Sequence, residues 1–187
     1  MRKVTAGLFV SLNSVTEFPE KWQLPHFDEE MAEAVAVVMA ATDAMLLGRM
    51  TYQEFASYWP GVSAEDQPFA NHMNNTPKYV VSRPLEEPLD WNNSTLIRER
   101  RGGSIQTEAA AGKDVLIFGS GELVNTLMQH DLIDEYRIML FHVLLGSGKR
   151  LSRDGSAQKA LKLLETKTFG SGVVVLSYRP ARSEAVV

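Results

Sequence analysis

The sequence predicts an α/β fold in three layers, with a central mixed, mostly parallel sheet that has helices on both faces. Apolar, β-branched runs such as Val4–Leu12 and Val115–Phe118 indicate buried strands, and helical segments follow them. The C-terminal third differs, because it contains long strand-like segments at Glu135–Val143, Leu161–Thr168 and Val173–Arg179. Alternating strands and helices with an antiparallel hairpin at the end are typical of such a sheet.

The N-terminal half is expected to alternate strands and helices. After the first strand, Asp28 is a plausible N-cap, with Glu29 and Glu30 in the first turn, so a helix runs to about Ala41. The elements expected next are a strand at Ala44–Leu47, a helix at Met50–Tyr58, a short helix at Phe69–Met73, and strands at Tyr79–Ser82 and Thr95–Ile97.

The second half begins with a helix expected at Ile105–Ala111. The strand Val115–Phe118 then turns at a glycine-rich segment into a helix from about Glu122 to His130. Glycines within Phe169–Val173 indicate a hairpin between the last two strands.

Composition narrows the class of protein. The length of 187 residues suits one domain, and the proportions of 44% hydrophobic and 22% charged residues are ordinary for a globular chain. The net charge of −4 and the lack of a basic arm argue against nucleic-acid binding. The absence of cysteine excludes disulfides, cysteine nucleophiles and thiolate zinc sites, and no histidine spacing suggests a metal site.

The N-terminus does not resemble a signal peptide, because Ser11 and Asn13 interrupt its short apolar stretch. The longest apolar run, Ala34–Ala41, is far shorter than the roughly 20 residues that span a bilayer. We therefore expect a cytoplasmic protein that does not bind membranes.

Three predicted strand ends carry polar turns, namely Gly48–Thr51, Ser82-Arg83 and Gly119–Glu122. In open α/β sheets ligands gather at the carboxyl ends of strands. Two of these turns open into helices, whose first N–H groups and positive dipole end suit a pyrophosphate. Arg49 and Arg83 are suited to hold a further phosphate by charge-assisted hydrogen bonds.

Each turn also has a plain structural interpretation. Gly48 is suited to a tight turn, Arg49 to a surface charge and Thr51 to helix capping. The third turn does not match the dinucleotide fingerprint G-x-G-x-x-G, because Val124 stands where a small residue is needed. Gly146–Arg150 likewise lacks the first glycine of a P-loop.

Taken together and in order, the motifs resemble a known group of enzymes. The stretches that carry the resemblance are Leu46–Tyr52, Lys78–Arg83, Ile117–Leu123, Asp134–Tyr136 and Leu144–Lys149. They resemble the dihydrofolate-reductase-like superfamily, and within it most of all the reductase domain of the bifunctional riboflavin-biosynthesis deaminase-reductase and its stand-alone relatives. The resemblance extends from about Lys3 to Pro180.

This resemblance implies that residues 1–187 form a single domain that binds NADPH and acts as a reductase. The strands Glu135–Val143 and Val173–Arg179 are long and apolar on more than one side, which predicts a homodimer, and the resemblance also suggests one. By the same resemblance, the adenosine-side phosphates of NADPH would be held by Gly48, Arg49, Thr51, Ser82 and Arg83. The pyrophosphate and nicotinamide would lie along Gly119, Ser120, Gly121, Glu122 and Leu123. Two arginines facing a 2′-phosphate would favour NADPH over NADH.

The residues on the substrate side depart from the family's pattern. Relatives often carry an acidic residue after the first strand, where this chain has Asn13, which cannot act as a general acid or base. As a candidate catalytic residue, Asn13 would instead orient the acceptor by a hydrogen bond to its carbonyl or hydroxyl. Asp28 is either a proton donor, if burial raises its pKa, or only a helix cap. Trp22, Phe27 and Trp59 either line a substrate pocket or pack in the core.

The expected function is thus an NADPH-dependent reductase that acts on a pterin, an aminopyrimidine or a similar carbonyl or imine. Two other functions are alternatives to it. A non-catalytic NADP(H)-binding or regulatory module would keep the cofactor turns without a substrate acid, as Asn13 suggests. A purely structural or assembly protein would bind no nucleotide, which the three phosphate-compatible turns argue against.

Overall fold

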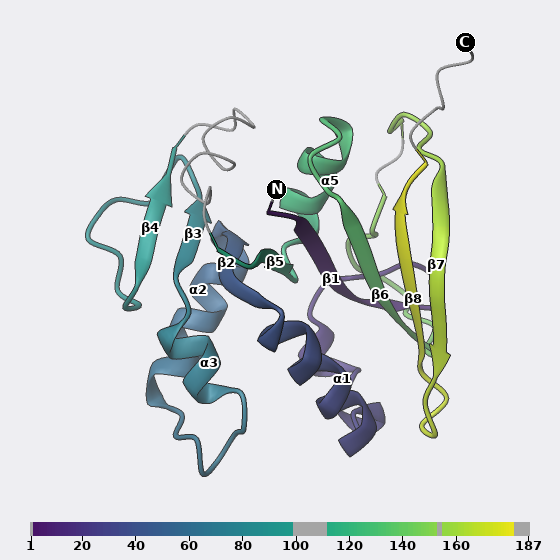
Figure 1. The fold of residues 1–187 in the computed structure, drawn as a ribbon, viewed down its shortest axis with the longest axis horizontal. Coiled ribbons are helices and arrows are strands. Elements are labelled where there is room, and N and C mark those ends of the chain that lie inside the picture. The colour runs from purple at the N-terminus through teal and green to yellow at the C-terminus, as the bar shows by residue number, and fades with distance from the viewer. Residues whose placement is uncertain (1, 99–111, 153–154, 182–187) are drawn as a thin grey trace.

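The computed structural model describes residues 2–98, 112–152 and 155–181. Within them an eight-stranded sheet has the order β4-β3-β2-β5-β1-β6-β8-β7. Strands β4, β3, β2, β5, β1 and β6 run parallel, and β8 and β7 complete the sheet in antiparallel pairs. The predicted mixed, mostly parallel sheet with an antiparallel C-terminal hairpin is therefore confirmed (Figure 1).

The expected elements are found with small shifts at their ends. The strands are β1 (Val4–Ser11), β2 (Thr42–Gly48), β3 (Lys78–Val81), β4 (Ser94–Ile97), β5 (Asp114–Phe118), β6 (Glu135–Phe141), β7 (Leu161–Thr168) and β8 (Val174–Pro180). The helices are α1 (Glu29–Ala40), α2 (Arg49–Tyr58), α3 (Ala70–Asn75) and α5 (Gly121–Gln129), with 3₁₀ turns η1 (Pro19–Lys21), η2 (Leu24–His26) and η3 (Trp59–Gly61). The helix expected at Ile105–Ala111 lies outside the described residues.

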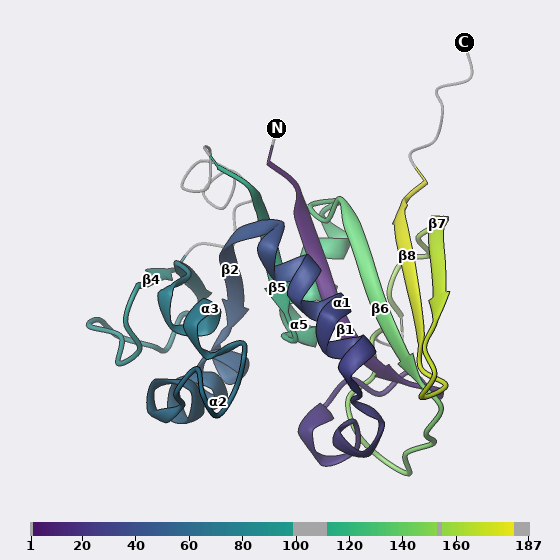
Figure 2. The same cartoon turned by 60° about the horizontal axis from the view of Figure 1, so that its bottom comes forward.

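Helices cover the two faces of the sheet. In Figure 2, α1 crosses in front of β1 and β5, and α5 lies behind the same strands. Helices α2 and α3 follow β2 on the side of α1 (Figures 1 and 2). This arrangement agrees with the three layers that the alternating sequence pattern predicts.

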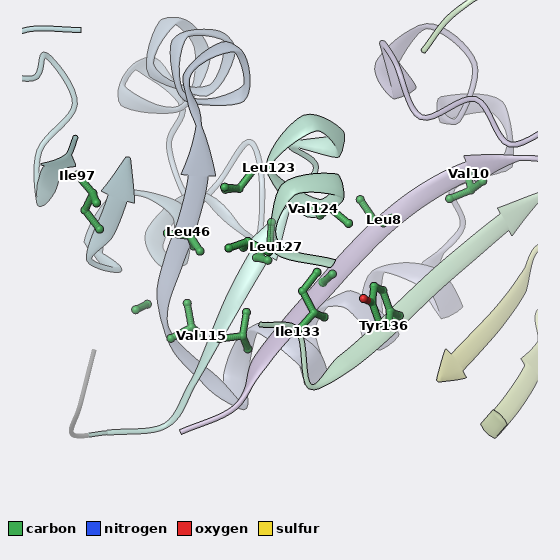
Figure 3. Packing of buried hydrophobic residues seen from close by; sticks show 14 residues of the cluster. Leu8, Val10, Leu46, Ile97, Val115, Leu123, Val124, Leu127, Ile133 and Tyr136 are labelled. Carbon is green, nitrogen blue, oxygen red and sulfur yellow. The ribbon is translucent and has the colours of Figure 1, made fainter. Parts of the chain in front are cut away.

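The core on the α5 side is formed by alternate residues of the central strands. In β1 these residues are Ala6, Leu8 and Val10, and they belong to one buried cluster with Leu123 and Leu127 of α5. Figure 3 shows the leucines of α5 pointing toward the strands. The two-residue alternation of the strands thus divides the apolar residues between the faces.

The core on the α1 side uses the other residues of the same strands. Met31, Val35 and Met39 recur at helical spacing on α1 and pack in one cluster with Met45 and Leu47 of β2. Full burial of such side chains stabilises the fold by about 1.5–3 kcal/mol each. Helix α1 therefore closes this face of the sheet.

The C-terminal hairpin forms one edge of the sheet. The Phe169 N–H donates to the Val173 carbonyl at 2.9 Å, so the glycine-containing turn joins β7 and β8 as predicted. Strand β7 is exposed along its whole length, and Leu161, Leu163 and Leu164 are 37%, 49% and 49% exposed. Among the described residues, no helix has the length and apolar character needed to cross a membrane.

Candidate functional site

The carboxyl ends of the parallel strands lie along one edge of the sheet. At this edge the pairing of β1 with β6 extends further than the pairing of β1 with β5. Strand β5 pairs with β1 as far as Gly7 and Phe118, whereas β1 and β6 stay paired as far as Ser11 and Phe141. The helices that follow β1 and β5 lie on opposite faces (Figure 2). The strand order reverses at such a point, and open α/β sheets bind ligands there.

The turn after β2 and the turn after β5 are hydrogen-bonded to each other. The Gly48 N–H donates to Ser120 Oγ at 3.0 Å, and the Ser120 N–H donates to Thr51 Oγ1 at 3.1 Å. Both helices that begin at these turns, α2 and α5, therefore have their N-termini held side by side. The predicted residues Gly48, Thr51 and Ser120 thus lie together at this edge.

The backbone at Gly119 and Ser120 is left-handed. Gly119 has φ +65°, and a Cβ there would lie 3.4 Å from Thr51 Cγ2. Ser120 has φ 54° and ψ 48°, which is uncommon for a residue with a side chain and is held here by its two hydrogen bonds. Strained backbone of this kind clusters at binding sites.

The first turn of α5 contains the remaining residues predicted for this segment. The Leu123 side chain is only 7% exposed and packs in the core, so it can offer a ligand little more than its backbone. Glu122 is the acidic residue of the first turn, where the helix dipole favours a negative charge. Gly121 lies against the β1–α1 loop, because a Cβ there would be 3.0 Å from Thr16 Oγ1.

The turn after β3 lies beside the turn after β2. The register pairs Gly48 with Val81, so Arg49 and Ser82 leave the same edge of the sheet on neighbouring strands. Ser82 is buried and its hydroxyl accepts the Leu85 N–H at 3.2 Å. Arg49 and Arg83 are exposed, and Arg49 donates to Gln53 Oε1 at 3.2 Å. Two exposed arginines therefore follow neighbouring strands at this part of the edge.

A row of aromatic side chains crosses the same edge. The Phe9 ring centre lies 6.0 Å from that of Phe118 and 5.5 Å from that of Phe141, so Phe9 near the end of β1 connects the last residues of β5 and β6. Of the predicted pocket residues, Trp22 packs on Phe141 at 5.4 Å and Phe27 on Phe9 at 6.3 Å. Phe141 is fully buried and supports the row from beneath, whereas Phe9 and Phe118 are partly exposed and form an apolar surface suited to a flat organic molecule.

The third predicted aromatic residue, Trp59, packs farther along this row. Its ring lies 6.4 Å from Phe55 of α2, which in turn lies 6.0 Å from Phe118. Trp59 therefore extends the aromatic row from the strand ends to the end of α2.

Comparison with known proteins identifies the family. A model of the RibD C-terminal domain matches residues 106–175. The uncharacterized protein YyaP of Bacillus subtilis is 31% identical over 141 residues, which cover 73% of each chain. The chain belongs to the RibD C-terminal domain family.

Solved structures agree with this assignment at the level of the fold. The putative riboflavin biosynthesis protein of Shewanella sp. PV-4 has a TM-score of 0.79 at 19% identity, over 96% of this chain and 99% of that chain. The riboflavin biosynthesis reductase Rib7 of Saccharomyces cerevisiae has a TM-score of 0.61 at 16% identity, over 96% and 90%. The predicted dihydrofolate-reductase-like fold is confirmed, and the family relation is consistent with a reductase.

Asn13, just after β1, has a structural role. Its Nδ2 donates to the Leu145 carbonyl at 2.6 Å, and its Oδ1 accepts from the Leu145 N–H at 3.1 Å and from Ser11 Oγ at 2.9 Å. An amide can make both kinds of bond to the backbone of one residue, whereas a carboxylate could only accept. Asn13 thus fastens the end of β1 to the loop after β6.

Asp28 caps α1. Its Oδ1 accepts the Met31 N–H at 2.8 Å, and this hydrogen bond holds the pKa of the carboxyl below its ordinary value. A role as proton donor would require that burial raise the pKa of Asp28. The pKa is lowered instead, so the carboxyl stays ionised near neutral pH. The helix-cap interpretation is therefore the one that the structure favours.

Sequence reasoning missed the row of rings, and it also missed two titratable features, on α2 and between η2 and β6. Burial raises the pKa of Glu54 on α2, and the carboxylates of Glu20 and Glu17 raise it further, so Glu54 retains a proton more readily than Asp28. The rings of His26 and His142 lie 4.5 Å apart, although they come from η2 and from the end of β6. Within the described ranges, no group of three His, Cys, Asp or Glu side chains could hold a metal ion.

Proposed function

We propose that this member of the RibD C-terminal domain family is an NADPH-dependent reductase of a small soluble substrate, and that residues 1–187 form a single domain. The observation that carries the proposal is the pair of helix N-termini held together by Gly48, Thr51 and Ser120 beside two exposed arginines. Helix N-termini and arginines both favour anions, so the edge suits a dinucleotide with several phosphates.

The chain's residues fit NADPH in charge and shape. Arg49 and Arg83 would face the phosphates of the adenosine half, next to Ser82. The backbone of Gly121, Glu122 and Leu123 would face the pyrophosphate, where left-handed Gly119 and Ser120 turn the chain. When bound, NADPH supplies the hydride that the reaction transfers.

The partly exposed rings of Phe9 and Phe118 would hold the acceptor and exclude water from it, and the buried ring of Phe141 would support Phe9. A pterin, an aminopyrimidine or a similar flat carbonyl or imine compound fits such a surface. Asn13 and Asp28 would keep the surrounding loops in place, since both are engaged in structural hydrogen bonds. A proton, where the acceptor needs one, would come from solvent.

Calorimetry with NADPH and NADH tests the cofactor. NADPH should bind at least about tenfold more tightly, because a charge-assisted contact to the 2′-phosphate contributes about 1.5–3 kcal/mol. Exchange of Arg49 and Arg83 for glutamine should remove the preference. Equal affinities of the unaltered protein for both nucleotides would contradict the assignment.

A non-catalytic NADP(H)-binding module is the second candidate. The observation that favours it is the lack of a proton donor at Asn13 and Asp28, since the first is an amide and the second has a lowered pKa. Oxidation of NADPH, followed by its absorbance in the presence of pterin, pyrimidine and imine acceptors, separates the two. Binding without turnover of any acceptor would favour the module.

We further propose a cytoplasmic homodimer. The exposed leucines Leu161, Leu163 and Leu164 of the edge strand β7 support the dimer, because soluble proteins usually cover an apolar edge strand. An isologous contact between two copies of β7 would cover it in both chains.

A further inference from the structure

The hydrogen bonds between the two helix N-termini continue the sheet beyond its last strand pair. The register of β2 and β5 ends at Leu46 and Ile117. Beyond this point, side-chain hydroxyls replace backbone carbonyls as the hydrogen-bond acceptors between the two segments. Ser120 Oγ accepts from the Gly48 N–H, and Thr51 Oγ1 accepts from the Ser120 N–H. The two turns are thus connected in both directions, each by a hydroxyl of the other.

These contacts already engage the polar groups that a phosphate would otherwise use. The N–H groups of Gly48 and Ser120 donate to the hydroxyls at 3.0 and 3.1 Å, so neither N–H points to a ligand. A Cβ on Gly48 would lie 3.6 Å from Ser120 Cβ, which shows how closely the turns pack. The groups left to face phosphates belong to residues on either side of these contacts, such as Arg49 on α2 and the first turn of α5.

We propose that Thr51 and Ser120 are positioning residues, which fix the separation between the half-site at the α2 N-terminus and the half-site at the α5 N-terminus. This inference rests on the proposed binding of NADPH, whose two halves would occupy the two half-sites. A dinucleotide gains affinity when its second half binds at a fixed distance from the first, because that step is then intramolecular. Loosening the turns lowers this gain and leaves each half-site intact.

The test compares the affinity for NADPH with the affinity for its adenosine half alone. Thr51→Val removes the acceptor at nearly constant volume, and Ser120→Gly removes the hydroxyl while it tolerates the left-handed backbone. Both variants should bind NADPH about tenfold or more weakly. Both should bind adenosine 2′,5′-bisphosphate, the adenosine half alone, as the unaltered protein does. Thr51→Ser, which keeps the hydroxyl, should restore the affinity for NADPH.

Thr126→Val is a matched control on α5, because among the described residues the Thr126 hydroxyl bonds within its own helix, to the Glu122 carbonyl at 3.0 Å. It should leave both affinities unchanged. Thermal unfolding of each variant verifies that the fold is retained under the conditions of the titration.

Three outcomes would overturn the inference. Equal loss of affinity for both ligands in Thr51→Val would show a direct contact with the adenosine half. Unchanged NADPH affinity in both Thr51→Val and Ser120→Gly would show that the contacts serve folding alone. If the unaltered protein bound neither ligand, the proposed function itself would fail and this inference with it, and that result is distinct from the other two.

Discussion

The ammonium group of Lys78 lies 4.2 Å from the centre of the Trp91 ring, inside the protein. It also donates to the carbonyls of Asn74, Thr76 and Asn92 at 3.1, 2.9 and 3.1 Å. Lys78 is only 1% exposed, although it begins strand β3. A single buried cation therefore ties the end of α3 to the loop that leads into β4.

The first prediction concerns this cation. Lys78→Met should destabilise the protein by about 1–3 kcal/mol at neutral pH, because three buried carbonyls lose their donor. Urea unfolding gives this difference. Lys162→Met, on the exposed strand β7, is the control and should change stability by less than about 0.5 kcal/mol.

The pH dependence follows from the same group. Burial lowers the pKa of Lys78 from 10.5 to about 8, so between these values the unfolded chain binds more protons than the folded one. Stability from this group therefore rises with pH across that interval, and Lys78→Met should abolish the rise. The scan should end near pH 10, since burial raises the pKa of Tyr136 to about 12 and reverses the trend above 10. An unchanged profile would show that Lys78 does not titrate in this interval.

Local sequence signals predicted the helices, strands and turns. They could not predict contacts between residues that are far apart in the sequence. The Asp28 cap and the hairpin at Phe169–Val173 depend on neighbouring residues, so their patterns sufficed. The burial of Lys78 could not be predicted, because a lysine in a strand usually reaches water and its acceptors come from two other segments.

The same limit applies to the candidate site. The three polar turns were found because each follows an apolar strand, as the carboxyl-end rule requires. The row of rings was missed, since Phe9, Phe118 and Phe141 lie far apart in the chain and become neighbours only through strand pairing. Likewise, nothing in the sequence near Asn13 shows that its partner is Leu145.

The second prediction concerns Gly7 in the middle of β1. A Cβ there would make an ordinary contact of 3.4 Å with Leu116 Cδ1, and alanine loses less conformational freedom on folding than glycine. Gly7→Ala should therefore stabilise the protein by about 0.5–1 kcal/mol in urea unfolding. Gly148→Ala should do the opposite, because Gly148 has φ +127° and a Cβ would lie 2.5 Å from Val15 Cγ1. Destabilisation by Gly7→Ala would show that β1 has no room for a methyl group.

The third prediction concerns Asp28. Its pKa lies below the ordinary 3.8, so its contribution to stability is present above that value and is lost as pH falls through the folded-state pKa. Asp28→Asn keeps a capping side chain that does not titrate. The variant should therefore lose less stability than the unaltered protein as the pH falls, and its stability at pH 7 should change little. Unfolding midpoints from about pH 6 down to pH 3 measure it, with Asp90→Asn as a matched surface change. A large fall in NADPH turnover at unchanged stability would instead show a catalytic role.

The fourth prediction concerns assembly. If β7 pairs with its copy, light scattering should give twice the 20.8 kDa chain mass, and Leu163→Glu should give the single chain mass by placing charges in an apolar contact. Leu144→Glu is the control, because Leu144 is 74% exposed and lies outside β7. A single chain mass for the unaltered protein at micromolar concentration would contradict the dimer.

The last prediction concerns why residue 121 is a glycine. The resemblance to the reductase family implies that the cofactor needs the space, whereas a Cβ there would meet Thr16 Oγ1 at 3.0 Å before any ligand is bound. Gly121→Ala should therefore lower the unfolding temperature by a few degrees, and the added Thr16→Ala, which removes that oxygen, should restore it. NADPH titration of the double variant then separates the two reasons. Recovered stability with recovered affinity would assign the glycine to the contact with Thr16, and recovered stability with lost affinity would assign it to the cofactor.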